Sequence, residues 1–238
     1  MFFKKNTNPP QKNAAVIVAA GSGTRMGTEI PKQFLTVGGK PVLVYTLLKF
    51  NDNQHISEIV VVTKEEYIPY CQELVKTFDI GKVTAIVAGG ATRQQSVLNG
   101  INSVSDDADN VLIHDGARPL VSDETISKCA LALQNNKACA VGVPMKDTIK
   151  YSDNGEFIDR TVDRSRLWQI QTPQCFDRQL AVQYHKMAAN DGFEATDDCM
   201  LFEHYGERVA LVEGEYENIK ITSPQDIFVM EGLLGDNI

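Results

Sequence analysis

The sequence has no apolar run that approaches the roughly 18 residues of a membrane-spanning helix, so we expect no transmembrane segment. It also has no excess of basic residues, because 23 lysines and arginines stand against 31 aspartates and glutamates, a net charge of −8. Such a balance repels a nucleic-acid backbone and disfavours a general nucleic-acid binder. A local pocket for phosphate groups remains compatible with this composition.

The five cysteines are odd in number and widely scattered, with no CxxC motif and no Cys/His cluster of zinc spacing. We therefore expect buried, apolar cysteines in place of a disulfide framework or a zinc site. The N-terminal stretch has two phenylalanines before its lysines and no apolar region behind them, unlike a signal peptide. The sequence predicts a cytoplasmic protein with a flexible leader over residues 1–13 and a single domain over residues 14–238.

Apolar runs typical of buried strands alternate with stretches of helical periodicity along the first 144 residues. The expected strands and the helices between them are 14–20, 58–63, 82–88, 110–115 and 138–144, and 41–50, 65–78, 92–104 and 122–136. This alternation predicts an α/β fold with a Rossmann-like, mostly parallel sheet and helices on both faces. Ligands of such sheets bind beyond the carboxyl ends of the strands, so the residues after each strand are the candidates for chemistry.

The alternation stops after Pro144, where Asp153-Asn154-Gly155 separates two extended segments. This pattern is typical of a β-hairpin. We expect residues 145–170 to form a projecting β arm that covers its own active site or a partner subunit. Beyond the arm the sequence predicts two helices, a strand, a second short strand and a last helix, at 177–190, 196–205, 208–214, 218–222 and from Pro224.

A glycine-rich segment, Gly21 to Gly27, follows the first strand, and its G-x-G-x-x-x-G spacing is one residue longer than the dinucleotide fingerprint. The second strand ends at Lys64 where a ribose-binding acid would stand, so an NAD site is disfavoured. Gly39-Lys40 is followed by proline, which excludes a Walker A motif. Backbone N–H groups of this turn, with Arg25 and Lys32, are candidates for binding a triphosphate. The alternative is a tight turn beside solvated cations.

Two further loops follow predicted strands. In residues 89–96, glycines precede a helix, and Ser96 could face a ligand from its first turns; a plain strand-to-helix connection is the alternative. In the next loop, Asp115 stands just past a buried strand, beside Gly116 and Arg118. An exposed carboxylate there suits Mg²⁺, which favours one or two carboxylates with phosphate oxygens and water. A structural Asp115–Arg118 ion pair is the alternative.

An ordered set of motifs resembles those of the 2-C-methyl-D-erythritol 4-phosphate cytidylyltransferase family: AAGSGTRMG, IPKQF, GGATRQQSV, HDGARP, PMKDTIK, VDRSRLW, QTPQCF, ATDD and ENIKIT. The resemblance runs from about Ala15 to the C-terminal helix, with one departure, Gly116, where many members have alanine. It implies a fold of the nucleotide-diphospho-sugar transferase type and a homodimer formed through the arm. It also implies transfer of CMP from CTP to methylerythritol phosphate, with release of pyrophosphate, in isoprenoid precursor biosynthesis.

The same resemblance implies roles for individual residues. CTP would be bound by Ala19, Ala20, Gly21, Ser22, Gly23, Lys32, Gly90, Ser96, Asp115 and Gly116. Methylerythritol phosphate would be bound by Arg118, Arg164, Thr172, Thr196 and Lys220, with Arg164 delivered to the neighbouring subunit by the arm. The catalytic cations would be Arg25, Lys32, Arg164 and Lys220, and a divalent metal, Mg²⁺, would be bound by Asp115. Glu217 ranks low as a second carboxylate at the metal.

The chemistry of this reaction agrees with a site built from cations, because two highly anionic substrates must meet. The attacking phosphate is already ionised near neutral pH, so no side-chain nucleophile or general base is required. The four histidines are accordingly isolated in the sequence: His55, His114, His185 and His204. Two other functions stay open at this point, a ribitol-5-phosphate cytidylyltransferase and a non-catalytic nucleotide-binding module. The ribitol branch is expected to carry AGG in place of Ala19-Ala20-Gly21.

Overall fold

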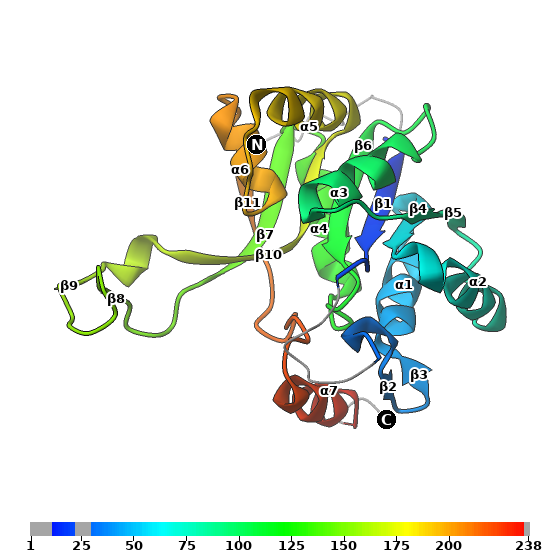
Figure 1. Ribbon diagram of the computed structural model, residues 1–238, viewed down its shortest axis with the longest axis horizontal. Coiled ribbons are helices and arrows are strands. Elements are labelled where there is room, and N and C mark those ends of the chain that lie inside the picture. The colour runs from blue at the N-terminus through cyan, green and yellow to red at the C-terminus, as the bar shows by residue number, and fades with distance from the viewer. Residues whose placement is uncertain (1–10, 22–29, 236–238) are drawn as a thin grey trace, which may run out of the picture.

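The computed structural model describes residues 11–21 and 30–235, and its central feature is a seven-stranded sheet in the order β11-β7-β10-β6-β1-β4-β5 (Figure 1). Neighbours pair in parallel except for β10, which runs antiparallel to both β6 and β7. The predicted mostly parallel sheet is therefore confirmed. The strands are β1 (Asn13–Val18), β4 (Ile56–Thr63), β5 (Val83–Ala88), β6 (Asn110–Asp115), β7 (Ala138–Pro144), β10 (Trp168–Asp177) and β11 (Ala210–Glu213).

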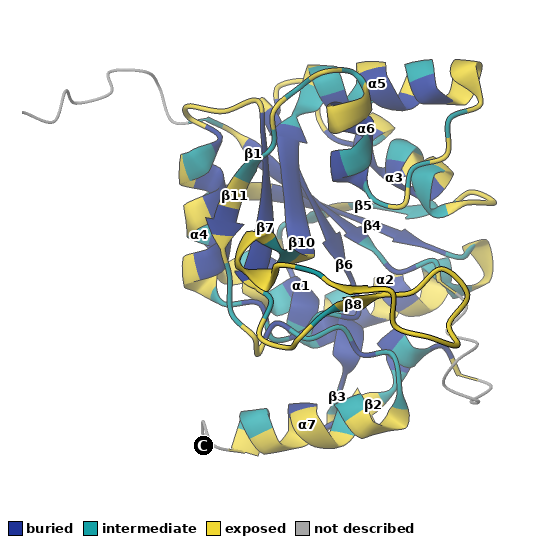
Figure 2. Ribbon diagram, turned by 90° about the vertical axis from the view of Figure 1, so that its left-hand side faces the viewer, coloured by how far each residue is buried: buried dark blue, intermediate teal, exposed yellow. Residues whose placement is uncertain are grey.

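Helices cover both faces of the sheet, and Figure 2 shows the buried strands between the two layers. One layer contains α1 (Val42–Asp52), α2 (Ile68–Thr77) and α4 (Asp123–Ala132); the other contains α3 (Arg93–Asn102), α5 (Arg178–Asp191) and α6 (Asp198–His204). Because side chains alternate along a strand, β1 sends Ala15 and Ile17 into the first core and Ala14 and Val16 into the second. This explains why the central strands have continuous apolar sequences.

Local signals set where several of the helices begin. The hydroxyl of Thr92 accepts a hydrogen bond from the backbone N–H of Gln95 at the start of α3, and Ser122 accepts one from Thr125 at the start of α4. Both residues satisfy an N–H group that has no partner within the helix. At the C-terminal end of α5, Gly192 adopts a left-handed conformation, φ 67°, which glycine tolerates better than other residues do.

Strand β10 is the strand of the central sheet that the sequence pattern missed. Its buried stretch contains polar side chains that tertiary contacts satisfy: Gln171 Nε2 donates to the carbonyl of Glu215, and Gln174 Nε2 to Asp197 Oδ2. Such residues interrupt the apolar pattern that marks a core strand. The opposite error concerns residues 218–222, which were expected to form a strand and form none, although the N–H of Ile221 donates to the carbonyl of Ala117 at 2.8 Å.

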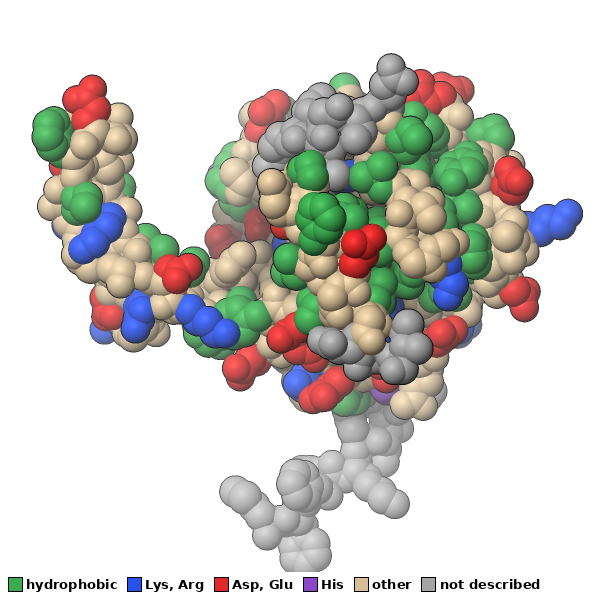
Figure 3. Space-filling view, turned by 90° about the horizontal axis from the view of Figure 1, so that it is seen from below, with side chains coloured by type: hydrophobic (Ala, Val, Ile, Leu, Met, Phe, Trp, Pro, Cys, Tyr) green, Lys and Arg blue, Asp and Glu red, His purple; other side chains and the backbone are tan. Residues whose placement is uncertain are grey.

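A hairpin arm leaves the body between β7 and β10, and Figures 1 and 3 show it standing clear of the rest of the molecule. Its tip pairs β8 (Lys150–Tyr151) with β9 (Arg160–Thr161) around the predicted turn. The last residues of the predicted arm, 168–170, belong to β10 and pair with β7. Residues 1–10 of the predicted leader lie outside the described residues.

A last helix, α7 (Pro224–Gly235), packs beside the short hairpin of β2 (Thr36–Val37) and β3 (Lys40–Pro41) and closes a third, small apolar cluster. Over residues 11–21 and 30–235, no helix is both long and apolar enough to cross a bilayer. The cytoplasmic location stays a prediction.

Candidate active site

A cavity of about 570 Å³ opens at the carboxyl ends of the parallel strands β1, β4, β5 and β6. The lining residues belong to these strand ends, the loops after them and the segment before α7: Val18, Ala19, Ala20, Gly21, Lys32, Gln33, Lys64, Gly89, Gly90, Ala91, Thr92, Arg93, Ser96, Asp115, Ala117, Lys220 and Thr222. The cavity therefore lies where a parallel sheet was expected to bind its ligand.

The lining concentrates positive charge. It includes four cationic side chains, Lys32, Lys64, Arg93 and Lys220, and one carboxylate, Asp115. The whole chain has a net charge of −8, so this wall differs in sign from the rest of the protein. A concave, cationic wall attracts and binds polyanionic small molecules such as phosphates.

The first lining loop, Ala19 to Gly21, is held against the body from two sides. The backbone N–H of Ala19 donates to the carbonyl of Val62 at 2.7 Å. The buried amide of Gln33, in the 3₁₀ helix Lys32–Phe34, donates to the carbonyls of Ala19 and Gly21 at 2.6 and 3.2 Å. Gln33 thus shapes the loop while its neighbour Lys32 lines the cavity. The predicted Ser22, Gly23 and Arg25 lie outside the described residues.

The second lining loop needs its two glycines. A Cβ at Gly89 would lie 2.7 Å from Ala20 Cβ, and a Cβ at Gly90 would lie 2.4 Å from Gln95 Cβ. The Ser96 hydroxyl accepts from the N–H of Gly90 at 3.0 Å and donates to the carbonyl of Thr92 at 2.9 Å. Ser96 therefore lines the cavity, as predicted, and also holds the loop in shape.

Asp115 is the charged centre of the cavity wall. Its Oδ2 lies 2.9 Å from Lys220 Nζ and 3.4 Å from Arg118 Nε. Burial raises the pKa of this carboxyl, but Lys220, Arg93 and Arg118 together hold the pKa well below its usual range. Asp115 is consequently ionised near neutral pH. It both forms the ion pair with Arg118 that was one of the two predicted alternatives and lines the cavity.

A hydrogen-bonded chain behind the cavity orients Asp115. The carbonyl of Arg118 can only accept, so His114 donates to it through Nε2 at 3.1 Å, and His114 Nδ1 accepts from the Thr172 hydroxyl at 3.0 Å. The same hydroxyl accepts from the backbone N–H of Asp115 at 3.1 Å. Burial lowers the pKa of His114 to about 4, so its ring is neutral.

Three predicted site residues lie immediately behind the lining. Thr172 is buried in the chain just described, and Arg118 donates to the carbonyl of Asn218 at 2.6 Å. Gly116 packs under the first loop, where a Cβ would lie 3.1 Å from both Ala19 Cβ and Leu43 Cδ1. These residues support the wall, and Ala117 lines the cavity in the place expected of Gly116.

Two predicted residues lie away from the lining. Arg164, in the 3₁₀ helix Arg164–Arg166 of the arm, donates to the carbonyl of Lys146 and is exposed. Thr196 is also exposed, and both its backbone N–H and its hydroxyl contact Met200 Sδ, at 3.4 and 3.6 Å. The structure of one chain therefore does not gather either residue with Lys220.

Sequence reasoning missed Arg93, Lys64, Gln33 and Thr222. Arg93 forms an ion pair with the buried Asp198 at 2.8 Å, and Asp198 Oδ1 in turn lies 3.5 Å from Nε2 of the buried His185. Asp197, in contrast, caps α6 by accepting from the N–H of Met200. Lys64 and Arg93 each follow a predicted strand within a few residues, and that placement was the available signal.

The fold and the cavity define a class: an α/β enzyme that uses a cationic, glycine-lined pocket at the strand ends for a nucleotide or another phosphorylated substrate. Comparison with known proteins refines it. The family described as 2-C-methyl-D-erythritol 4-phosphate cytidylyltransferase matches residues 13–236. A relative of that name from Caldanaerobacter subterraneus is 51% identical over 219 residues, 92% of this chain and 96% of the relative. Another, from Clostridium novyi, is 48% identical over 94% of this chain and 96% of its own.

Solved structures agree with the sequence comparison. The 4-diphosphocytidyl-2C-methyl-D-erythritol synthase of Anaerococcus prevotii superposes with a TM-score of 0.85 at 35% identity, covering 95% of this chain and 97% of its own. The cytidylyltransferase of Thermus thermophilus superposes with a TM-score of 0.77 at 35% identity, covering 94% and 98%.

The chain therefore belongs to the 2-C-methyl-D-erythritol 4-phosphate cytidylyltransferase family. The predicted enzyme class, a CTP-dependent cytidylyltransferase of isoprenoid precursor biosynthesis, is confirmed by this membership. Between the alternatives that the sequence left open, the family match favours methylerythritol phosphate over ribitol 5-phosphate and an enzyme over a binding module.

Proposed function

We propose that the cavity binds CTP and methylerythritol phosphate together and that its cations promote transfer of CMP between them, with release of pyrophosphate. The observation that carries this proposal is the wall itself. Lys220 is held on Asp115, and Lys32, Lys64 and Arg93 line the same space. A cavity of about 570 Å³ falls within the range of small-molecule sites, roughly 300–1,000 Å³.

Repulsion between the two substrates is the main obstacle to this reaction. An oxygen of the phosphate monoester must approach the α-phosphorus of CTP in line with the departing pyrophosphate. Two unit charges about 4 Å apart at a protein surface repel by about 4 kcal/mol, and a cation between them offsets a similar amount. We assign this neutralisation to Lys32 and Lys220, which both line the cavity.

The residues around the cavity fit a reaction without a general base. His114 is adjacent to Asp115, but both of its ring nitrogens are engaged, one with the Arg118 carbonyl and one with the Thr172 hydroxyl. Its low pKa also makes it a poor proton acceptor. We assign His114 and Thr172 to positioning of Asp115. The incoming phosphate, with a second pKa of about 6, supplies its own ionised oxygen.

Asp115 fits the Mg²⁺ ion that the family resemblance implies. It is an ionised oxygen ligand in the cavity wall, and its ion pairs with Lys220 and Arg118 both use Oδ2. Mg²⁺ needs only one or two carboxylates beside phosphate oxygens and water. When bound there it would neutralise phosphate oxygens and charge developing at phosphorus. Glu217 is exposed and outside the lining, which agrees with its low rank as a second ligand.

A direct assay tests the function. Purified protein is incubated with CTP, Mg²⁺ and either methylerythritol phosphate or ribitol 5-phosphate, and pyrophosphate is measured. We expect release with methylerythritol phosphate only. Release with ribitol 5-phosphate alone would overturn the substrate assignment, and silence with both would refute catalysis by this cavity.

The arm completes the proposal as the contact of a homodimer. Phe157 and Ile158, near its tip, are 74% and 65% exposed, which is an unfavourable state for large apolar side chains in a monomer. Arg164 lies on the same arm, away from the cavity of its own chain. In a twofold dimer, exchange of the arms would bring Arg164 of each subunit to the other's cavity.

Subunit mixing tests arm exchange. Chains carrying Lys32→Ala and chains carrying Arg164→Ala, each nearly inactive, are unfolded and refolded together in equal amounts. Random pairing makes about half of the dimers mixed, and one site of each mixed dimer then has neither defect, so activity returns to roughly a quarter of wild type.

The matched control mixes Lys32→Ala with Lys220→Ala. Both of these residues line the cavity of their own chain, so every site keeps one defect and no activity returns. Failure of the first mixture to recover, once mixed dimers are demonstrated, would refute arm exchange and leave the reaction itself untouched.

A further inference from the structure

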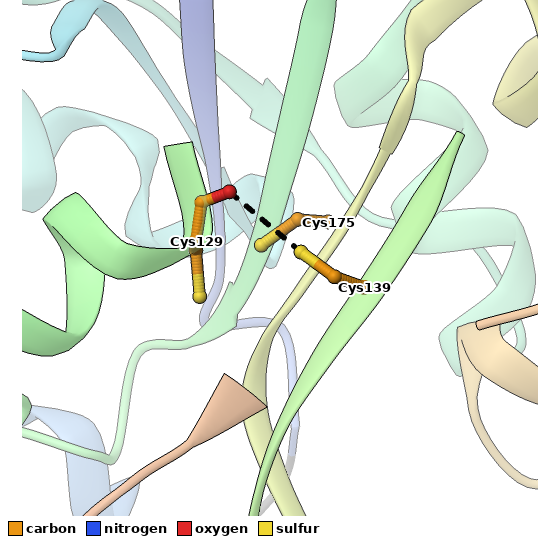
Figure 4. A group of neighbouring side chains, drawn as sticks. All are labelled: Cys129, Cys139 and Cys175. Atoms are coloured by element: carbon orange, nitrogen blue, oxygen red, sulfur yellow. Dashed lines mark hydrogen bonds between the residues drawn. The ribbon is translucent and has the colours of Figure 1, made fainter. Parts of the chain in front are cut away.

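Three of the five cysteines meet in the core, although they are far apart in the sequence. Cys129 lies on α4, Cys139 on β7 and Cys175 on β10, and their sulfur atoms all lie within 4.8 Å of one another (Figure 4). Cys139 and Cys175 are direct partners across the antiparallel β7–β10 pair. The Cys139 thiol also contacts the carbonyl of Cys129 at 3.7 Å.

The surroundings of this trio are apolar. All three side chains are fully buried, and they belong to the core cluster under α1, α2 and α4, with Leu112 and Val141 among its members. Within the described part of the chain, no histidine or carboxylate joins the group as a further ligand. The trio also lies outside the cavity lining, so the proposed reaction does not use it.

The three thiols also shift one another's pKa values. Hydrogen bonds from Cys129 and Cys175 lower the pKa of Cys139, although burial opposes this. The pKa values of Cys129 and Cys175 are raised in turn. These mutual shifts agree with the short distances between the three sulfur atoms, which lie within 4.8 Å of one another.

Charge balance decides which centre suits such a place. A divalent ion with three thiolates leaves a net charge of −1, and a monovalent ion leaves −2. Among the described residues no lysine or arginine is buried, so none compensates such a charge in the core. An uncompensated buried charge costs far more than a neutral group. A trivalent centre with three thiolates is neutral, and three soft ligands satisfy a soft trivalent centre without a fourth.

We propose that Cys129, Cys139 and Cys175 form a binding site for a trivalent, thiol-seeking centre, with arsenic(III) as its probe. The step is an exchange without oxidation or reduction: three S–H bonds and three As–O bonds of arsenous acid, As(OH)₃, break. Three As–S bonds form, and each hydroxide leaves with a thiol proton as water. The neutral product, As(SR)₃, remains in the core.

The geometry supports this exchange. Three sulfur atoms bonded at about 2.3 Å to one pyramidal centre stand about 3.4 Å apart, so atoms that now lie within 4.8 Å need to approach by at most about 1.4 Å. Entry requires displacement of α4, the helix that carries Cys129 over β7 and β10. We therefore expect slow binding, at a rate set by local opening of this helix.

The test uses full-length protein reduced with a phosphine, in buffer free of thiols, and incubated with arsenite. We expect native mass spectrometry to show one arsenic per chain, added with loss of three hydrogens. Single alanine variants at Cys129, Cys139 or Cys175 should bind about 10²-fold more weakly, because a third intramolecular thiol is lost. Cys71→Ala and Cys199→Ala are matched controls, since both are buried cysteines outside the trio, and they should bind like wild type.

X-ray absorption of arsenic in the loaded wild-type protein counts its sulfur neighbours directly and depends on no variant. Three sulfur neighbours are expected. The proposal would be overturned by fewer than three sulfur neighbours or by arsenic binding that survives loss of the three cysteines. It would also be overturned if the unfolded chain binds arsenic and the folded protein does not. Circular dichroism of every variant shows which of them remain folded.

Discussion

Acid should destabilise this protein through His114, at pH values where carboxyl groups are still ionised. The His114 ring is buried behind Asp115 and has a pKa of about 4, against about 6.5 in an unfolded chain. Between these values the unfolded chain binds a proton that the folded protein excludes. Stability from this group is therefore complete above about pH 6.5 and is lost as the pH falls toward 4.

The magnitude follows from the two pKa values. Between about pH 7.5 and about pH 4.5, proton linkage at His114 alone removes about 2.5 kcal/mol from the free energy of unfolding. The depressed pKa of Asp115 adds its own loss only at lower pH, because its unfolded value is 3.8. His185, whose pKa burial also lowers, contributes with the same sign.

The assay is urea unfolding of wild type and His114→Gln at both pH values. Glutamine can donate to the Arg118 carbonyl and accept from the Thr172 hydroxyl without titrating, so the variant should lose about 2.5 kcal/mol less than wild type on acidification. His185→Gln is the comparison that keeps His114 titrating. An equal pH dependence in wild type and His114→Gln would refute the argument.

Three further predictions concern the cavity. Lys32→Ala should lower kcat by about 10²–10⁴, while Lys49→Ala, on the exposed side of α1, leaves kcat unchanged; a loss below about tenfold would reduce Lys32 to a solvated cation. Asp198→Asn removes the buried charged partner of Arg93 and should lower the free energy of unfolding by about 3 kcal/mol. It should also raise KM for CTP more than KM for methylerythritol phosphate, and equal changes in the two KM values would count against a nucleotide-binding role of Arg93. CTP should be turned over in preference to ATP, since a purine overfills a pocket lined by Ala19, Gly90 and Ser96, and equal rates would contradict this.

Much of the fold could be predicted because its signals are local. The apolar runs around Ile17 and Val61 are typical of strands buried on both faces, and Thr92 and Ser122 stand at the starts of the helices that they cap. The predicted helices and strands over the first 144 residues accordingly match the structure within a few residues. Strand β10 escaped this reasoning because Gln171 and Gln174 are buried by partners far away in the sequence.

The residues of the cavity likewise include some that local motifs indicate and others that only distant contacts place. Glycine-rich loops after strands and the family motifs pointed to Lys32, Gly90, Ser96, Asp115 and Lys220, all of which line the cavity. The motifs could not show that Arg93 joins them, because its orientation depends on Asp198, which is 105 residues away in the sequence. Nor could they show how Thr172 reaches His114 and Asp115 from an antiparallel strand.

The sequence by itself determined the α/β class, the strand-end location of the chemistry and the family, because periodicity, turn residues and ordered motifs are properties of short segments. Only the tertiary structure decided which charges are paired, which polar residues are buried, and that Cys129, Cys139 and Cys175 meet. The physical reason is distance. Coulombic, hydrogen-bonding and thiol contacts act over a few ångströms in space, and the order of neighbouring strands, not the order of residues, sets those separations.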